Sequence, residues 1–289
     1  RGLDTRIRTS DQVGRRTEAP VIAELLAVRN SVRDFRRTQV LPVTRRAATP
    51  FTESIRQLRT AIEIAVAHEE HPVVVITAAD DYGPRSFITA NVAASFGLSG
   101  MRVVVVAGDL RRPELADLLP ARSTSDPRDL RPVGAVPNTS ILRLPESELD
   151  PADLLATPGV RDLIEQVRRD ADLVIIDAPP VLAAADATIL GRYATTSVLV
   201  AAARATHSDI LTHSIEHLRT SSVDLAGVAL AEVRVGRSMA YASTYGDDRA
   251  APYEPPARDE GEPGPAEDVP GPAAAAPAAL TPAAAGEER

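Results

Sequence analysis

The chain has 289 residues, and its 44% hydrophobic and 25% charged content is typical of a globular domain that dissolves in water. It contains no cysteine, which excludes disulfide bonds and thiolate metal sites. All 32 basic residues are arginine, so no reaction or phosphate site in this chain can use a lysine. No apolar run approaches the roughly 20 residues that cross a bilayer.

The formal net charge of −8 is concentrated at the C-terminus. Residues 246–289 hold ten acidic and three basic residues, so residues 1–245 carry a net charge of only −1. This near-neutral part gives no support for a nucleic-acid-binding surface. The terminal segment also holds nine prolines and many alanines, and such a composition buries too little apolar surface to fold. We therefore predict a disordered acidic tail, which we delimit at residues 236–289.

The N-terminal residues 1–50 are rich in arginine and contain one apolar patch, "APVIAELLAV". We interpret them as an arm or linker that docks partly on the following domain. A helix is predicted from near Thr52 to about His68, because Ile55, Leu58 and Ile62 recur at helical spacing.

Residues 51–235 contain six continuous apolar runs, which predict strands buried on both faces of a parallel sheet. The runs lie at 73–77, 102–108, 140–144, 172–177, 197–203 and 225–233. Helices are predicted between them at 86–98, 159–170, 183–193 and 208–221. Strands that alternate with helices predict an α/β fold with a doubly wound, mainly parallel sheet flanked by helices. In such a fold, ligands bind at the carboxyl ends of the strands.

The first apolar run ends in "TAADDYGPRSF", which has the strand–loop–helix frame of a phosphate-binding loop. Gly83, Arg85 and Ser86 are the candidates for binding a nucleotide there, and Ser86 is placed to ligate Mg²⁺. The alternative is an ordinary turn between a strand and a helix, because Pro84 removes one backbone N–H donor.

Two further strand ends carry charged side chains. Asp109 and Arg111 follow the second run directly, and Asp177 closes the run "DLVIID". An aspartate in the position of Asp177 commonly holds Mg²⁺ through water. We predict Asp109 and Asp177 as catalytic residues, Arg111 as a nucleotide contact and Asp177 as a metal ligand with Ser86. The alternative for Asp109 is a local ion pair in a solvated loop.

These strand ends resemble the cytoplasmic domain of bacterial tyrosine kinases (BY-kinases), a group of polysaccharide co-polymerases related in fold to the ParA/MinD ATPases. The resemblance covers roughly residues 1–245 and is carried by "ESIRQLR", "DLRRP" and "DLVIIDAPPVLAAADA". It implies a P-loop NTPase-like fold, and ATP with Mg²⁺ as cofactors if the site is functional, otherwise none. It also implies that residues 1–50 are a juxtamembrane segment, and that the chain is part of a membrane-anchored protein at the cytoplasmic face of the cell membrane.

The sequence departs from the family pattern in three separate parts of the expected site. Arg85 replaces the lysine of the phosphate loop, and Tyr82 and Pro84 stand where that loop has glycines. Ala107 replaces the first acidic residue of the motif after the second strand, and Ala231 replaces an asparagine that helps to hold adenine in relatives. Together these changes predict an eroded ATP site.

Other parts of the family pattern are retained. Glu53, Arg56 and Arg59 match the motif that supports ring-like homo-oligomers in the family. Three of the five tyrosines lie within 13 residues beyond the last strand and match the family's phosphoacceptor cluster; they are Tyr241, Tyr245 and Tyr253. The implied membrane partner is a polysaccharide co-polymerase region, in the same chain or in another.

Three functions are compatible with these patterns. The first is a kinase-like domain with an impaired ATP site, which regulates exopolysaccharide or capsule synthesis as an oligomeric scaffold. The second is an active tyrosine autokinase that uses Arg85 in place of the lysine, since phosphoryl transfer depends mainly on positioning and charge. The third is a ParA/MinD-like positioning ATPase, which the "ESIRQLR" helix and the tyrosine cluster disfavour. We favour the first.

Overall fold

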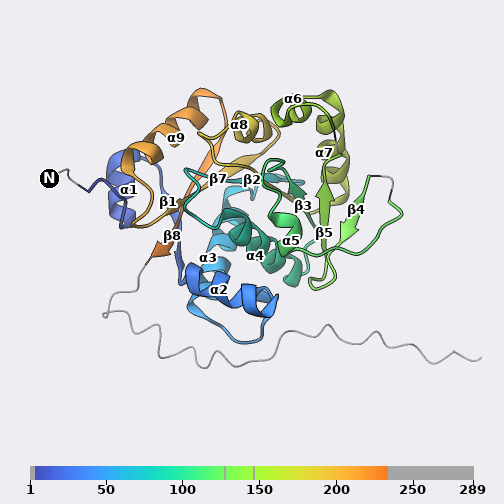
Figure 1. The fold of residues 1–289 in the computed structure, drawn as a ribbon, viewed down its shortest axis with the longest axis horizontal. Coiled ribbons are helices and arrows are strands. Elements are labelled where there is room, and N and C mark those ends of the chain that lie inside the picture. Colours follow the sequence, from blue (N-terminus) through green and yellow to red (C-terminus); the bar gives the residue numbers. More distant parts are fainter. Residues whose placement is uncertain (1–3, 127, 146, 234–289) are drawn as a thin grey trace, which may run out of the picture. The chain divides into compact units, whose positions relative to one another are not determined.

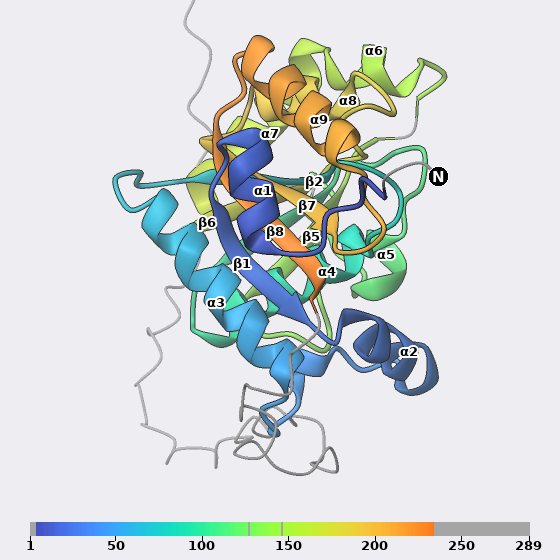
Figure 2. The same cartoon turned by 90° about the vertical axis from the view of Figure 1, so that its left-hand side faces the viewer.

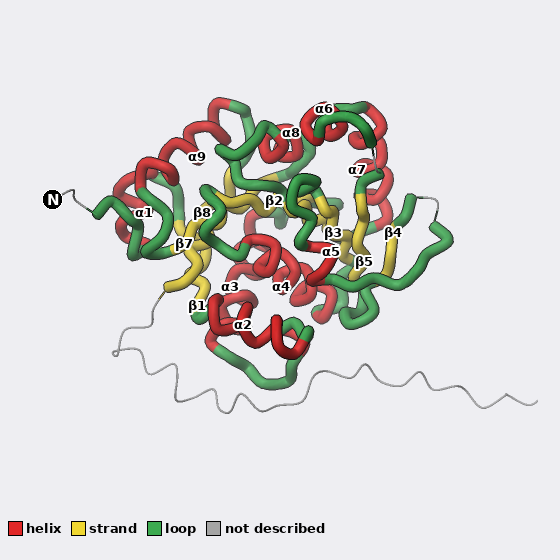
Figure 3. Tube along the Cα trace, viewed as in Figure 1, coloured by secondary structure: helices red, strands yellow, loops and turns green. Residues whose placement is uncertain are grey.

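The computed structural model describes residues 4–126, 128–145 and 147–233. These residues form an α/β domain in which helices cover both faces of one eight-stranded sheet (Figures 1 and 3). The strand order is β1-β8-β7-β2-β6-β3-β5-β4. Every neighbouring pair is parallel except β4 with β5. The predicted fold class is confirmed.

The strands include all six predicted apolar runs, together with a first and a fourth strand that were not predicted. They are β1 (Val21–Leu26), β2 (Val73–Ala78), β3 (Val103–Ala107), β4 (Leu130–Pro132), β5 (Thr139–Arg143), β6 (Leu173–Asp177), β7 (Thr196–Ala202) and β8 (Leu225–Val233). The helices are α1 (Ser10–Thr17), α2 (Val28–Thr38), α3 (Pro50–Ala65), α4 (Arg85–Leu98), α5 (Leu115–Leu118), α6 (Pro151–Leu155), α7 (Pro158–Asp170), α8 (Asp186–Gly191) and α9 (Ser208–Thr220), with a 3-10 turn η1 (Pro42–Thr44).

The central strands are apolar at every position because both of their faces are covered. In β2, Val74 and Ile76 pack into the core shared with α3 and α4, whereas Val73 and Val75 pack into the core shared with α7 and α9. All six residues of β2 are buried. Burial of apolar area on both faces at roughly 25 cal/mol per Å² is the main stabilising contribution to such a sheet.

The predicted arm contributes to the sheet, so the packed domain extends well before residue 51. Its apolar patch forms β1, which pairs in parallel with β8 at the edge of the sheet. Helices α1 and α3 lie beside β1 (Figure 2). Ala23 and Leu25 on β1 are buried in the core, which explains why the patch is apolar within an arginine-rich segment.

The predicted tail, with Tyr241, Tyr245 and Tyr253, lies outside the described residues. Within the described ranges, no helix is both long enough and apolar enough to cross a membrane.

Candidate functional site

The candidate site lies where β2, β3 and β6 end, next to the first turn of α4. Arg85 is the first residue of α4 and follows Pro84, which occupies the N-cap position without a side-chain cap. The Arg85 side chain turns inward and is only 8% exposed. A buried guanidinium is costly unless it is paired with acids and hydrogen-bonded, and the strand ends supply two carboxylates.

Arg85 binds both predicted catalytic aspartates. Its Nε donates to Asp177 Oδ1 at 3.0 Å, and one of its terminal nitrogens donates to Asp177 Oδ2 at 3.3 Å. The same terminal nitrogen donates to Asp109 Oδ2 at 2.8 Å. Asp109 and Asp177 are 3% and 1% exposed, so all three charged groups lie in the interior. The structure thus brings together three of the site residues predicted from three different strand ends.

Two hydroxyl groups of α4 complete the hydrogen bonding of Asp177. Ser86 Oγ donates to Asp177 Oδ2 at 2.7 Å, and Thr89 Oγ1 donates to Asp177 Oδ1 at 2.9 Å. Each carboxylate oxygen therefore accepts one bond from Arg85 and one from a hydroxyl group. Both oxygens of Asp177 are directed at donors of the protein itself.

Asp109 is held by its own loop as well as by Arg85. Its Oδ1 accepts the backbone N–H groups of Arg111 at 3.2 Å and Arg112 at 2.9 Å. The preceding Gly108 lies so close to β6 that a Cβ atom there would be 2.9 Å from the carbonyl oxygen of Asp177. This close approach requires glycine and fixes the distance between the two strand ends. Ala107 is paired in register with Asp177.

The charge state of Arg85 follows from its partners. Burial alone lowers the pKa of its guanidinium, but the attraction and hydrogen bonds of Asp177 and Asp109 outweigh burial, so the pKa lies above its ordinary value. A raised pKa means that the positive charge is kept at every pH below the ordinary arginine value. The stabilisation that Arg85 contributes would be lost only when the pH rises through its folded-state pKa.

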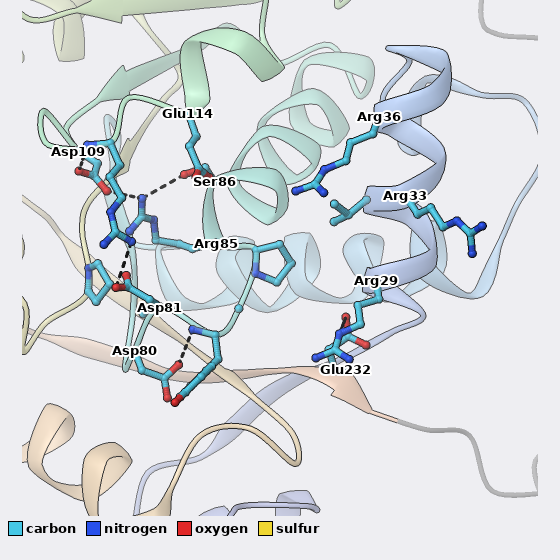
Figure 4. Close-up of a pocket in the computed structure, with 17 residues that line it drawn as sticks. Arg29, Arg33, Arg36, Asp80, Asp81, Arg85, Ser86, Asp109, Glu114 and Glu232 are labelled. Carbon is cyan, nitrogen blue, oxygen red and sulfur yellow. Dashed lines mark hydrogen bonds and ion pairs between the residues drawn. The ribbon is translucent and has the colours of Figure 1, made fainter.

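A cavity of about 470 Å³ opens between this network and α2 (Figure 4). Its walls come from α2, from the loop after β2, from the loop after β3 and from the end of β8. The lining residues are Arg29, Val32, Arg33, Arg36, Ala78, Asp80, Asp81, Tyr82, Gly83, Pro84, Arg85, Ser86, Asp109, Arg112, Glu114, Pro180 and Glu232. Gly83, Arg85 and Ser86, which are predicted to bind a nucleotide, all line this cavity. A volume of this size is in the range of small-molecule sites.

Unlike the other residues predicted to contact a nucleotide, Arg111 does not line the cavity. Its Nε donates to Asp186 of α8 at 3.0 Å, and a terminal nitrogen donates to Asp150 at 3.1 Å. Asp186 is fully buried, so Arg111 neutralises it and ties the loop after β3 to α8. Arg112, the next residue, lines the cavity and pairs with Asp81 at 3.1 Å.

The residues predicted for self-association lie on α3, away from the cavity. Arg56 is half-exposed and pairs with Glu53 one turn earlier. Arg59 donates to the backbone oxygen of Ser95 on α4 at 3.1 Å and pairs with Glu63 at 3.5 Å. Arg59 therefore fixes α3 on α4, whereas Arg56 is available at the surface.

The residues as arranged do not fit a bound Mg²⁺ ion. The two oxygens of Asp177 and the hydroxyl group of Ser86 would be its ligands, but they face the Arg85 guanidinium and one another. Within the described residues, no cluster of three His, Asp or Glu side chains could hold a metal ion. A metal ion would have to displace Arg85, whose charge would then lie beside a second cation.

Two parts of the site were not predicted from the sequence. Thr89 completes the bonding of Asp177, and its signal is a hydroxyl residue one helical turn after Arg85. The basic wall formed by Arg29, Arg33 and Arg36 comes from the predicted arm. Their spacing of four and three residues places them on one face of a helix. The prediction of residues 1–50 as an arm or linker does not include this helix.

Comparisons with known proteins agree with the fold. No protein-family model matches the chain. EpsB of Ralstonia solanacearum is 30% identical over 231 residues, which are 75% of this chain and 30% of EpsB. The tyrosine-protein kinase Etk of Escherichia coli K12 is 28% identical over 199 residues, which are 65% of this chain and 27% of Etk. The chain thus spans less than a third of the length of these curated relatives.

Among solved structures, the BceF tyrosine kinase domain superposes with a TM-score of 0.71 and 27% sequence identity. The match covers 79% of this chain and all of the BceF domain.

The parallel sheet, the strand–loop–helix unit at β2–α4 and the charged strand ends define a P-loop NTPase-like domain. Within that class, the chain has the fold of the kinase domain of bacterial tyrosine kinases and is similar to that domain in sequence.

Proposed function

We propose that this domain is a non-catalytic relative of the bacterial tyrosine kinase domain, which no longer binds MgATP and acts as a self-associating scaffold in the regulation of exopolysaccharide or capsule synthesis. The observation that carries the proposal is the position of Arg85. Its guanidinium lies between Asp109 and Asp177 and makes hydrogen bonds to both. The two carboxylates that would orient Mg²⁺ are thereby neutralised by the protein itself.

The loop around Arg85 supports the same conclusion. Pro84 has no N–H to offer a phosphate group, and two acidic residues, Asp80 and Asp81, line the cavity where an anion would bind. The guanidinium of Arg85 is directed into the interior, toward the two carboxylates. No lysine exists elsewhere in the chain to replace it.

The proposal predicts that MgATP does not bind the purified chain. In calorimetric titrations with ATP and Mg²⁺ at millimolar concentrations we expect no saturable heat, because binding would require Arg85 to leave two buried carboxylates. The kinase domain of Etk is a suitable positive control. A Mg²⁺-dependent dissociation constant in the micromolar range would contradict the proposal.

The second candidate is an active tyrosine autokinase, favoured by the convergence of Arg85, Ser86, Asp109 and Asp177 at one helix N-terminus. It requires ATP to draw Arg85 out of the interior toward the phosphates. Incubation with MgATP would then produce phosphotyrosine, and Asp177→Ala would abolish that signal. If the wild-type chain forms no phosphotyrosine, the result supports the first candidate, the non-catalytic scaffold.

We further propose that Glu53 and Arg56 mediate ring-like association through the exposed side of α3, with Arg59 holding that helix in place. Arg56→Glu is expected to shift the mass measured by light scattering toward the monomer, because it places two like charges one turn apart on that surface. Arg169→Glu on α7 introduces the same charge change at an exposed site and should leave the mass unchanged. Equal masses for the wild type and Arg56→Glu would exclude this surface.

The proposed partner is a polysaccharide co-polymerase region in the membrane, in the same chain or in another. The resemblance of residues 1–245 to the family's cytoplasmic domains supports this partner and a position at the inner face of the cell membrane.

A further inference from the structure

The basic wall of the cavity holds more positive charge than the described residues neutralise. Arg29 lies 3.9 Å from Glu232. Arg33 and Arg36 are exposed and form no ion pair within the part of the chain that the structure describes. Arg36 extends from α2 toward the loop after β2, whereas Arg33 points outward at the rim (Figure 4). Cations three and four residues apart on a helix repel one another, so this wall is complementary to a negatively charged ligand.

Helix α2 is anchored to the domain by its other residues. Its only acidic residue, Asp34, pairs with Arg37 at 3.0 Å and with Arg45. Its buried residue Phe35 meets Phe87 of α4 edge-on, with 5.7 Å between the ring centroids. The helix is therefore held at the cavity before any ligand binds, and such preorganisation lowers the entropic cost of binding.

The charges around the cavity are separated by wall. Ten charged residues line it, five of each sign. On the side of the loops after β2 and β3, Arg85 and Arg112 are both paired with aspartates. Asp80 and Glu114 line the same side, which leaves it with a net negative charge (Figure 4). An anion in the cavity is therefore repelled from the loop side and attracted to the basic wall.

We propose that the basic wall binds a chain of linked phosphate groups without a metal ion. Arg29 and Arg36 are seven residues apart on a helix, which corresponds to about 10 Å. This span exceeds one phosphate group and suits a ligand with several anionic groups in a row. The planar fork of arginine can bind two phosphate oxygens at once. The cavity, at about 470 Å³, has the size of a small-molecule site.

Binding at the basic wall does not depend on the proposed loss of MgATP binding, because the wall belongs to α2 and not to the phosphate loop. The two sites differ in their expected response to Mg²⁺. A phosphate loop binds its nucleotide together with the ion. At the basic wall, Mg²⁺ would neutralise the phosphate charges that the arginines bind, so adding the ion should weaken binding there.

Calorimetric titration of the full chain with inorganic tripolyphosphate, in EDTA at low ionic strength, tests the proposal. We expect saturable binding at least tenfold tighter than that of inorganic monophosphate, and at least a tenfold loss of affinity in excess Mg²⁺. Arg33→Gln/Arg36→Gln should weaken the binding of tripolyphosphate at least tenfold. Glutamine is a good helix former, and this variant breaks no ion pair among the described residues.

Arg169→Gln/Arg219→Gln is the matched control. It removes two exposed charges from α7 and α9, which cover the opposite face of the sheet, and should change the dissociation constant less than twofold. ATP in EDTA is a second probe, which distinguishes an inorganic chain of phosphates from that of a nucleotide. Equal dissociation constants for the two probes would assign recognition to the phosphates alone, and tighter binding of ATP would show that the nucleoside also contributes.

Two results would overturn the proposal. The first is no saturable binding of either probe in EDTA, which would leave the proposed function unaffected. The second is an equal loss of affinity in the two double variants, which would indicate attraction by net charge and no defined site. Binding of ATP that Mg²⁺ strengthens, and that the α2 variant does not change, would instead place the ligand at the phosphate loop. That outcome would contradict both the basic wall and the proposed function.

Discussion

Asp177→Asn is expected to lower the free energy of unfolding by about 3–5 kcal/mol, the cost typical of breaking a buried ion pair by removing one partner. Asparagine has the same shape but no charge, and its amide group would present N–H donors to the guanidinium of Arg85. Arg85 would then remain buried with only Asp109 as a charged partner. Denaturant-induced unfolding followed by circular dichroism measures the loss.

Asp172→Asn is the matched control. Asp172 precedes the same strand at its other end and pairs with Arg102 at 2.6 Å, but both side chains are substantially exposed. Hydrogen bonds from Arg102 hold the pKa of Asp172 below its ordinary value, and a pair so exposed contributes only about 0–1 kcal/mol. A loss for Asp177→Asn no larger than the loss for the control would show that the buried network does not form.

A double-mutant cycle then separates the ion pair from packing. Arg85→Met removes the cation and leaves Asp109 and Asp177 as neighbouring buried carboxylates, so it is also expected to destabilise at pH 7. The double variant Arg85→Met/Asp177→Asn should lose less than the sum of the two single changes, with a coupling energy of about 2–3 kcal/mol.

The sheet and most helices could be predicted because the central strands are buried on both faces. This burial produces continuous apolar runs such as "VVVIT" and "DLVIID", which stand out from the amphipathic segments between them. The edge strands carry no such signal. β4 is only three residues long and includes Pro132, and β1 has an intermediate pattern in which Ala23 and Leu25 alone are fully buried.

For the site, the sequence predicted which side chains meet but not how each of them is oriented. The carboxyl ends of parallel strands meet at one edge of a sheet, so the proximity of Arg85, Asp109 and Asp177 could be expected from the sequence. The direction of the Arg85 side chain could not. It depends on how Asp109 and Asp177 are held in the interior as acceptors for Arg85. The hydroxyl group of Thr89 and the close approach at Gly108 help to hold them, and both appear only in three dimensions.

The reverse experiment is to rebuild a nucleotide site in this chain. The variant Tyr82→Gly/Pro84→Gly/Arg85→Lys/Ala107→Asp is expected to bind MgATP where the wild type does not. Glycine at 84 restores a backbone N–H donor, and a compact ammonium group leaves room for Mg²⁺ beside Asp177, which the planar guanidinium does not. The carboxylate introduced at position 107 would belong to the residue of β3 that is paired with Asp177 in the sheet.

Ligand-dependent stability is the appropriate measurement, because it registers binding even if no phosphoryl transfer follows. At a MgATP concentration about 100 times the dissociation constant, the rebuilt variant should gain about 2.7 kcal/mol in its free energy of unfolding. Arg85→Lys alone is the control. We expect MgATP to add little to its free energy of unfolding, because Pro84 still has no backbone N–H to donate to a phosphate group. If that single change is sufficient, the guanidinium is the whole obstacle. If the folded four-residue variant gains nothing, then the cavity itself excludes the nucleotide, and the loop sequence is not the cause.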